Sequence, residues 1–217
     1  MSLAIFDLDN TLLAGDSDVL WGQFLVEKGI VDAEYYGNEN QRFYDEYKNG
    51  TLDIMEFLAF SLKPLSEYPI TDLHQWREAF MQEKIHEILL DKSFELINQH
   101  KENGDVLLII TATNRFVTEP IAKLLGIPHL LATDPEFINN RYTGKVAGVP
   151  CFQEGKVTRL NSWLKENNEN LDGSYFYSDS HNDLPLLKQV TTPVAVDADE
   201  ILSQYAKENN WKTMSLR

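Results

Sequence analysis

Leu3-Ala4-Ile5-Phe6-Asp7-Leu8-Asp9-Asn10-Thr11 begins with four apolar residues and then becomes acidic. The apolar run has the composition of a buried strand. Ligands of an open parallel sheet bind just outside the carboxyl ends of its strands, so Asp7 and Asp9 predict a site there. The residues after Asp9 indicate a turn, so the two carboxylates need not share one role. The alternative is that both acids only cap a turn or lie in solvent.

The composition limits the classes of partner. With 217 residues, 43% of them hydrophobic, the chain can form one domain, or a core with a modest insertion. There are 19 Lys and Arg against 34 Asp and Glu, which gives a formal net charge of −15. Such a surface repels nucleic acid and anionic membranes, and we expect neither as a partner. An anionic substrate would therefore be held locally, by a bound cation and a few placed basic side chains.

The chain contains one cysteine, Cys151, so no disulfide can form within it. Cys151 has no CxxC partner and no adjacent histidine, which favours a packed thiol over a nucleophile. The first residues lack the basic region and long apolar run of a signal peptide, and no stretch is apolar for about 18 residues. We therefore expect a cytoplasmic protein.

The pattern from Asp16 to Leu90 is helical, interrupted by Asn49-Gly50, Pro64 and Tyr68-Pro69. Ser17 or Asp18 is the expected cap of its first helix. Aromatic residues recur here at helical spacing, which favours an ordinary core over a substrate pocket. The pattern predicts a helical insertion of about 75 residues.

Strands and helices then alternate, which is typical of right-handed parallel units. The aliphatic run Val106–Ile110 is expected to be a central strand buried on both faces. We also expect strands at 130–133, 174–178 and 193–196, a hairpin at 137–148, and helices at 93–103, 117–125, from 155 and at 200–207. The fold class predicted is α/β, a Rossmann-like parallel sheet with helices on both faces and an inserted α-helical cap.

Three expected strands end in polar clusters: Asp7 and Asp9, Thr111 to Asn114, and Asp179 to Asp183. A shared sheet would bring these ends together. Carboxylates, hydroxyls and one lysine suit phosphoryl transfer to a carboxylate, with Mg2+ bridging carboxylate and phosphoryl oxygens. The lysine expected here is Lys156, with Lys145 as a nearby competitor.

The sequence resembles the haloacid dehalogenase-like phosphatase superfamily over nearly its whole length. Asp7-Leu8-Asp9-Asn10-Thr11 matches the first motif, DxDxT, and Thr111, Lys156 and Asp179-Ser180-His181-Asn182-Asp183 resemble the second, third and fourth. The fourth motif is similar to that of the phosphoserine phosphatase-like branch, which places a helical cap between motifs one and two. The resemblance implies a core of residues 1–15 and 91–217 and a cap of residues 16–90.

The resemblance also implies a role for each matched residue. Asp7 would be the nucleophile that becomes an aspartyl-phosphate, and Asp9 the general acid and then the general base. Thr111 and the backbone N–H of Ala112 would bind the phosphoryl group, and Lys156 would balance its charge. Mg2+ would be bound by Asp7, by the backbone carbonyl of Asp9 and by Asp179, and Asp183 would complete the metal site by holding a metal-bound water or a neighbouring ligand. Simple turn or helix capping is the alternative for Thr111 and Asp183, and a solvated position is the alternative for Lys156.

The substrate implied is a small phosphorylated metabolite. Asp16 stands near the place where the phosphoserine branch has a glutamate that receives the substrate amine, and Asn114 is a further candidate contact or a turn cap. The motif-two region, Thr-Ala-Thr-Asn, is similar to a bacterial subgroup that includes histidinol-phosphate phosphatases. The rival functions are a phosphotransferase or mutase that uses the same aspartyl-phosphate, and a non-catalytic binding protein. The sequence sets neither the physiological substrate nor the oligomeric state.

Overall fold

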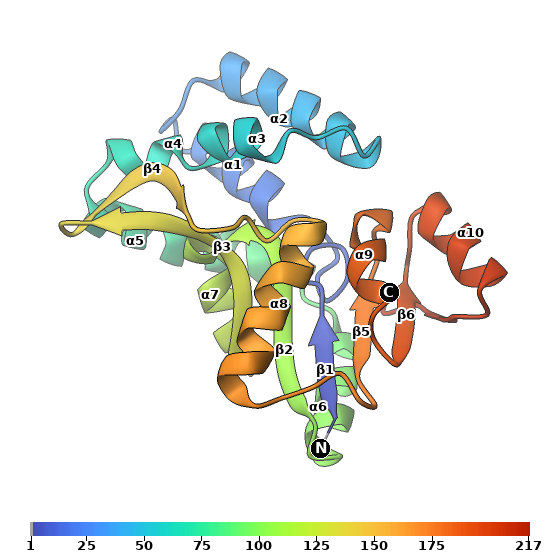
Figure 1. Ribbon diagram of the computed structural model, residues 1–217. Helices are drawn as coiled ribbons and strands as arrows, with labels where there is room; N and C mark the ends of the chain where they lie inside the picture. Colours follow the sequence, from blue (N-terminus) through green and yellow to red (C-terminus); the bar gives the residue numbers. More distant parts are fainter. Residues whose placement is uncertain (1) are drawn as a thin grey trace.

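A seven-stranded sheet forms the centre of the computed structural model, which describes residues 2–217 (Figure 1). Its strand order is β4-β3-β2-β1-β5-β6-β7, and every pairing is parallel except that of β3 with β4. The strands are β1 (Leu3–Phe6), β2 (Val106–Asn114), β3 (His129–Ile138), β4 (Arg141–Ala147), β5 (Tyr175–Ser178), β6 (Thr192–Val196) and β7 (Lys212–Met214). The predicted α/β class with a mostly parallel sheet is confirmed.

Alternate residues of the central strands pack against helices on opposite faces of the sheet. On one face Ala4, Phe6, Leu107 and Ile109 share a core with α6 (Asp91–Glu102) and α7 (Arg115–Leu124). On the other face the core is made with α8 (Glu154–Asn167), α9 (Leu184–Leu187) and α10 (Glu200–Glu208). Because β1 and β2 are covered on both sides, their apolar runs need no polar face.

The segment between β1 and α6 is helical and crosses above the carboxyl ends of the strands (Figure 1). It contains α1 (Ser17–Glu27), α2 (Ala33–Lys48), α3 (Ile54–Ser61), α4 (Lys63–Glu67), α5 (Ile70–Phe80), the π-helical turn η1 (Met81–Ile85) and the 3-10 turn η2 (His86–Ile88). An isolated bridge between Leu13 and Leu89 brings the two ends of this segment together. The division into a cap of residues 16–90 and a core of residues 1–15 and 91–217 stays a prediction.

Several local expectations differ from the structure. The first helix is capped by Asp16, whose carboxylate accepts from the backbone N–H groups of Asp18 and Val19, and not by Ser17 or Asp18. Strand β7 was not expected. The expected hairpin, by contrast, is present: it is formed by β3 and β4, and Asn139 and Asn140 both adopt positive φ at its turn.

Two other sequence expectations concern Cys151 and membrane helices. Cys151 is fully buried, and burial raises the pKa of its thiol to about 12, as expected of a packed side chain. Within residues 2–217, every helix is too short or too polar to cross a membrane.

Candidate active site

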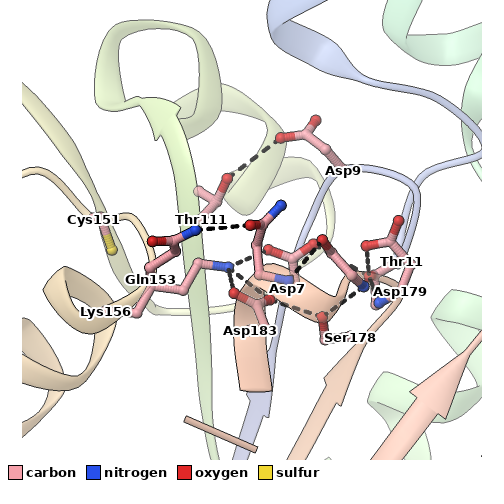
Figure 2. A network of polar contacts seen from close by, with 12 residues as sticks. Asp7, Asp9, Thr11, Thr111, Cys151, Gln153, Lys156, Ser178, Asp179 and Asp183 are labelled. Atoms are coloured by element: carbon pink, nitrogen blue, oxygen red, sulfur yellow. Dashed lines mark hydrogen bonds and ion pairs between the residues drawn. The ribbon is translucent and has the colours of Figure 1, made fainter. Parts of the chain in front are cut away.

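Asp7 directly follows β1, and its buried carboxylate has a different partner on each oxygen (Figure 2). The Nζ of Lys156 donates to Oδ1 at 2.7 Å, and the hydroxyl of Thr11 lies 3.2 Å from Oδ2. Lys156 is also buried, and its Nζ donates to Asp183 at 2.8 Å. One ammonium thus bridges two carboxylates that come from the ends of β1 and β5.

Asp9 is held by a separate set of donors. The backbone N–H of Ser17 donates to its Oδ1 at 2.7 Å. The hydroxyls of Thr113 and Thr111 lie 2.8 and 3.3 Å from its Oδ2. Asp7 and Asp9 thus have different hydrogen-bond partners, and the inference that they have different roles stays a prediction.

Asp179 and Asp183 approach Asp7 from the loop after β5. The hydroxyl of Thr11 lies 3.2 Å from Asp179 Oδ1 and accepts the backbone N–H of Asp179 at 3.0 Å. Asp183 accepts from Lys156 and, at 2.7 Å, from the hydroxyl of Ser178. Its side chain makes no capping bond to α9, so helix capping does not account for it.

Burial of so many carboxylates changes their proton affinity. Burial, with a contribution from Asp183, raises the pKa of Asp7 to about 7 even though Lys156 opposes the shift. Burial and the charge of Asp16 raise the pKa of Asp9 to about 6. Burial, Asp7 and Asp183 hold the pKa of Asp179 well above its usual range. The single ammonium of Lys156 does not balance the negative charge collected here.

The uncompensated charge fits a divalent cation. Within residues 2–217, no group of three or more His, Cys, Asp or Glu side chains is arranged so that it could hold a metal ion by itself. Mg2+ does not require one, because it is usually held by one or two carboxylates together with waters and substrate phosphate. One or two of the carboxylates of Asp7, Asp179 and Asp183, with the backbone carbonyl of Asp9, would fit this mode of Mg2+ binding.

A cavity beside these carboxylates is lined by residues from the strand ends and from the helical segment. Its lining includes Asp7, Asp9, Thr111, Ala112, Lys156 and Asp183, together with Asp16 and Asp18. Phe43, Tyr44, Tyr47 and Phe57, from α2 and α3, and Phe152 supply aromatic rings. Some aromatics at helical spacing thus line the cavity, whereas Trp21, Phe24 and Phe80 are core residues as expected.

The other expected contacts are placed differently. Asn114 is buried; its Oδ1 accepts from Val117 N at the start of α7, and its Nδ2 lies 3.3 Å from Asp18. Asn114 is therefore a helix cap that also touches a cavity residue, and direct substrate contact stays a prediction. Lys145 is exposed on β4, so Lys156 is the lysine of this site.

Sequence reasoning did not assign Thr113, Ser178, Gln153, Asn182 or Tyr47 to the site. Thr113 could have been found, because it lies two residues after Thr111 on the same strand and shares its face. Ser178 likewise ends a strand beside the fourth motif. Asn182 contacts Gln153 and Tyr47 although both lie far from it in the sequence, and no local pattern indicates such contacts.

Comparisons with known proteins agree with this arrangement. The sequence model of the haloacid dehalogenase-like hydrolases matches residues 4–188. A histidinol-phosphatase from Neisseria meningitidis serogroup C (strain 8013) is 44% identical over 100% of this chain and 99% of its own. Phosphoserine phosphatase SerB1 from Mycobacterium tuberculosis (strain ATCC 25618 / H37Rv) is 29% identical over 99% of this chain and 70% of its own.

Two solved structures show the same fold. A protein of unknown function from Bordetella pertussis Tohama I has a TM-score of 0.94 and 40% identity, covering 100% of this chain and 99% of its own. A substrate-bound phosphoserine phosphatase has a TM-score of 0.71 at 20% identity, over 94% of this chain and 89% of its own. From the family match and the full-length relative, the chain belongs to the haloacid dehalogenase-like hydrolases and is a phosphatase.

Proposed function

We propose that this chain is a Mg2+-dependent phosphatase that hydrolyses a small phosphomonoester through an aspartyl-phosphate on Asp7. The observation that carries the proposal is the 2.7 Å contact between Asp7 and Lys156, which both line the cavity. An ionised Asp7 beside a fixed ammonium is a nucleophile that an anionic phosphoryl group can approach.

Asp9 is held by hydrogen-bond donors that Asp7 does not share, which supports a role for Asp9 in proton transfer. Asp9 gives a proton to the leaving alcohol and then accepts one from the water that hydrolyses the aspartyl-phosphate. Its pKa of about 6 lies close to neutral pH, where a group exchanges protons in both directions. The hydroxyl of Thr111 and the N–H of Ala112 bind phosphoryl oxygens. Mg2+ supplies positive charge to the phosphoryl oxygens when it is bound by Asp7, Asp179, Asp183 and the carbonyl of Asp9.

The acidic side chains that line the cavity favour a substrate with an amine or an imidazole group. Lys156 is the one cation among the described residues that line the cavity, and two carboxylates already engage it. Burial raises the pKa of Asp16 and Asp18, and neither has a cationic partner among its hydrogen bonds. A cationic group of the substrate, placed between these two acids and the aromatic rings, would balance the charge of the acids and stack on the rings. Histidinol phosphate fits this description, and so does a phosphoserine-like amine.

The test is Mg2+-dependent phosphate release from histidinol phosphate, phosphoserine and an aryl phosphate, with Asp7→Asn as the control. We expect one cationic phosphate to exceed the others in kcat/KM and the Asp7→Asn variant to be inactive. Phosphate transfer to added alcohols without matching free phosphate would instead indicate a phosphotransferase or mutase. No turnover by the unaltered protein, with Mg2+ binding intact, would indicate a non-catalytic binding protein.

A further inference from the structure

The side chain of Asn182 joins the helical segment to the turn that precedes α8. Its Nδ2 donates to the backbone carbonyl of Tyr47 in α2 at 3.2 Å, and its Oδ1 accepts from Gln153 Nε2 at 2.8 Å. Asn182 is buried and lines the catalytic cavity. A single amide group therefore contacts both the helix that covers the cavity and the start of the helix that carries Lys156.

The residue at the other end of this bond has a strained backbone. Gln153 has φ 46° and ψ −119°, a combination that residues with a side chain rarely adopt. Such a conformation is energetically unfavourable and persists only where the surroundings enforce it. The side-chain bond to Asn182 is one such restraint on Gln153, the residue that directly precedes α8.

The turn at Gln153 sets where α8 begins. The N–H of Gly155 donates to Phe152 O at 2.7 Å, and the N–H of Lys156 donates to Gln153 O at 3.0 Å. A Cβ added to Gly155 would clash with the backbone carbonyl oxygen of Pro150, so the turn leaves no space there. A change in the backbone conformation of Gln153 would therefore shift Lys156, because the backbone between the two residues is short and closely packed.

The C-terminal end of α2 rests on the same part of the core. A Cβ added to Gly50 would lie 3.2 Å from His181 Nε2, and the rings of Tyr47 and Phe152 are 6.1 Å apart. The bond from Asn182 to Tyr47 thus belongs to a wider contact between α2 and the loops that contain Phe152 and His181. Lifting α2 would remove that contact as a unit.

We propose that Asn182 is a positioning residue that makes the placement of Lys156 depend on α2 being seated over the cavity. With α2 in place, Tyr47 O fixes the orientation of the Asn182 amide, and that amide holds the side chain of the strained Gln153. With α2 displaced, the amide loses one of its two anchors and the turn is held less firmly. The lysine is then best placed only when the cavity is covered and water is excluded. For its kinetic consequence, this inference rests on the proposed function.

Gly50 and Gly29 offer a matched pair of variants. Their φ values are +69° and +67°, so an alanine meets nearly the same backbone strain at both positions. Only at Gly50 does the new methyl group meet another residue, His181. Gly50→Ala is expected to speed hydrogen exchange at residues 47–51 and also at the amides of Gly155 and Lys156, whereas Gly29→Ala leaves both regions unchanged. Faster exchange at 47–51 with unchanged exchange at Gly155 and Lys156 would overturn the proposal.

Gln153→Gly separates positioning from a merely structural role. Glycine adopts φ 46° without strain, so the melting temperature is expected to stay the same or rise. The bond to Asn182 is lost and glycine leaves the turn free to take other conformations, so kcat is expected to fall by about 10-fold to 100-fold while KM changes little. An unchanged kcat would contradict the proposal. If the unaltered protein hydrolyses no substrate, the proposed function fails, and the exchange at Gly155 and Lys156 in Gly50→Ala still decides this inference.

Discussion

The ammonium of Lys156 lies 2.7 Å from the carboxylate of Asp7, and both groups are buried at the end of β1. The same ammonium reaches Asp183, so removing it leaves two buried carboxylates close together. Removing one partner of a buried ion pair is far more costly than removing an exposed one. This contact therefore links the stability of the fold to the chemistry of the site.

We expect Lys156→Met to be both inactive and destabilised. Loss of the cation should lower kcat/KM by at least about 100-fold and reduce the free energy of unfolding by about 3–5 kcal/mol. Without Lys156 the pKa of Asp7 rises further, so the folded protein holds a proton that the unfolded chain releases, and the destabilisation should grow with pH. Urea unfolding at low and high pH measures this. Lys145→Met removes an exposed lysine and should change neither activity nor stability.

The stability of the metal-free protein should fall as pH rises. The pKa of Asp7 is raised from 3.8 to about 7 and that of Asp9 to about 6, mainly by burial. Between these values and 3.8 the folded state binds more protons than the unfolded state, so the free energy of unfolding decreases with increasing pH. Thermal unfolding between about pH 5 and pH 8 should therefore show a falling melting temperature.

Two comparisons test the cause of this fall. Asp7→Asn cannot ionise at this position and should flatten the decrease, whereas Glu95→Gln removes an exposed acid and should leave it unchanged. Mg2+ competes with protons for the same carboxylates, so added Mg2+ should raise the melting temperature more at about pH 8 than at about pH 5. Equal stabilisation at both values would mean that the ion binds elsewhere.

The sequence predicted those parts of the site that depend on strand ends. Asp7, Thr111 and Asp179 each follow an apolar run, and parallel pairing brings such ends to one edge of the sheet. Lys156 is less evident from a local pattern, and it was identified by resemblance.

The contacts between segments could not be predicted in the same way. Asn182 and Tyr47 are 135 residues apart, and nothing in either neighbourhood indicates the bond between them. Helical spacing marked Phe24 and Phe43 equally as apolar, although Phe24 lies in the core and Phe43 also lines the cavity. Helical periodicity indicates that a side chain is buried, but it does not indicate whether the side chain packs in the core or lines a cavity.

Thr113→Val is expected to change the pH dependence of the reaction. The Thr113 hydroxyl donates to Asp9 at 2.8 Å and thereby lowers its pKa, so valine should raise that pKa above its value of about 6. The kcat/KM for an alcohol leaving group needs Asp9 protonated, because it reports the steps through release of the alcohol. Its basic limb should therefore move to higher pH. Thr158→Val, on the exposed side of α8, is the control, and an unmoved limb in Thr113→Val would exclude Asp9 as the acid.

Asp16→Asn should weaken the binding of cationic substrates and spare others. Asparagine caps helices as well as aspartate does, so α1 should remain intact while the charge on the cavity wall is lost. A hydrogen bond to a charged group contributes about 1.5–3 kcal/mol, which predicts a rise in KM of about 10-fold to 100-fold for an amine or imidazole phosphate. KM for an aryl phosphate should stay nearly constant.

Asp32→Asn is the matched control for this change. Asp32 caps α2 through an exposed bond to Tyr35 N at 2.7 Å, and it does not line the cavity. Asp32→Asn also removes one negative charge and puts an asparagine at a helix cap, but away from the residues that line the cavity. KM should therefore stay constant for both substrates. If Asp16→Asn raised KM equally for the amine and the aryl phosphate, Asp16 would act on the phosphate end of the cavity or on its shape. Selection of the cationic group would then have to come from Asp18 or from the aromatic rings.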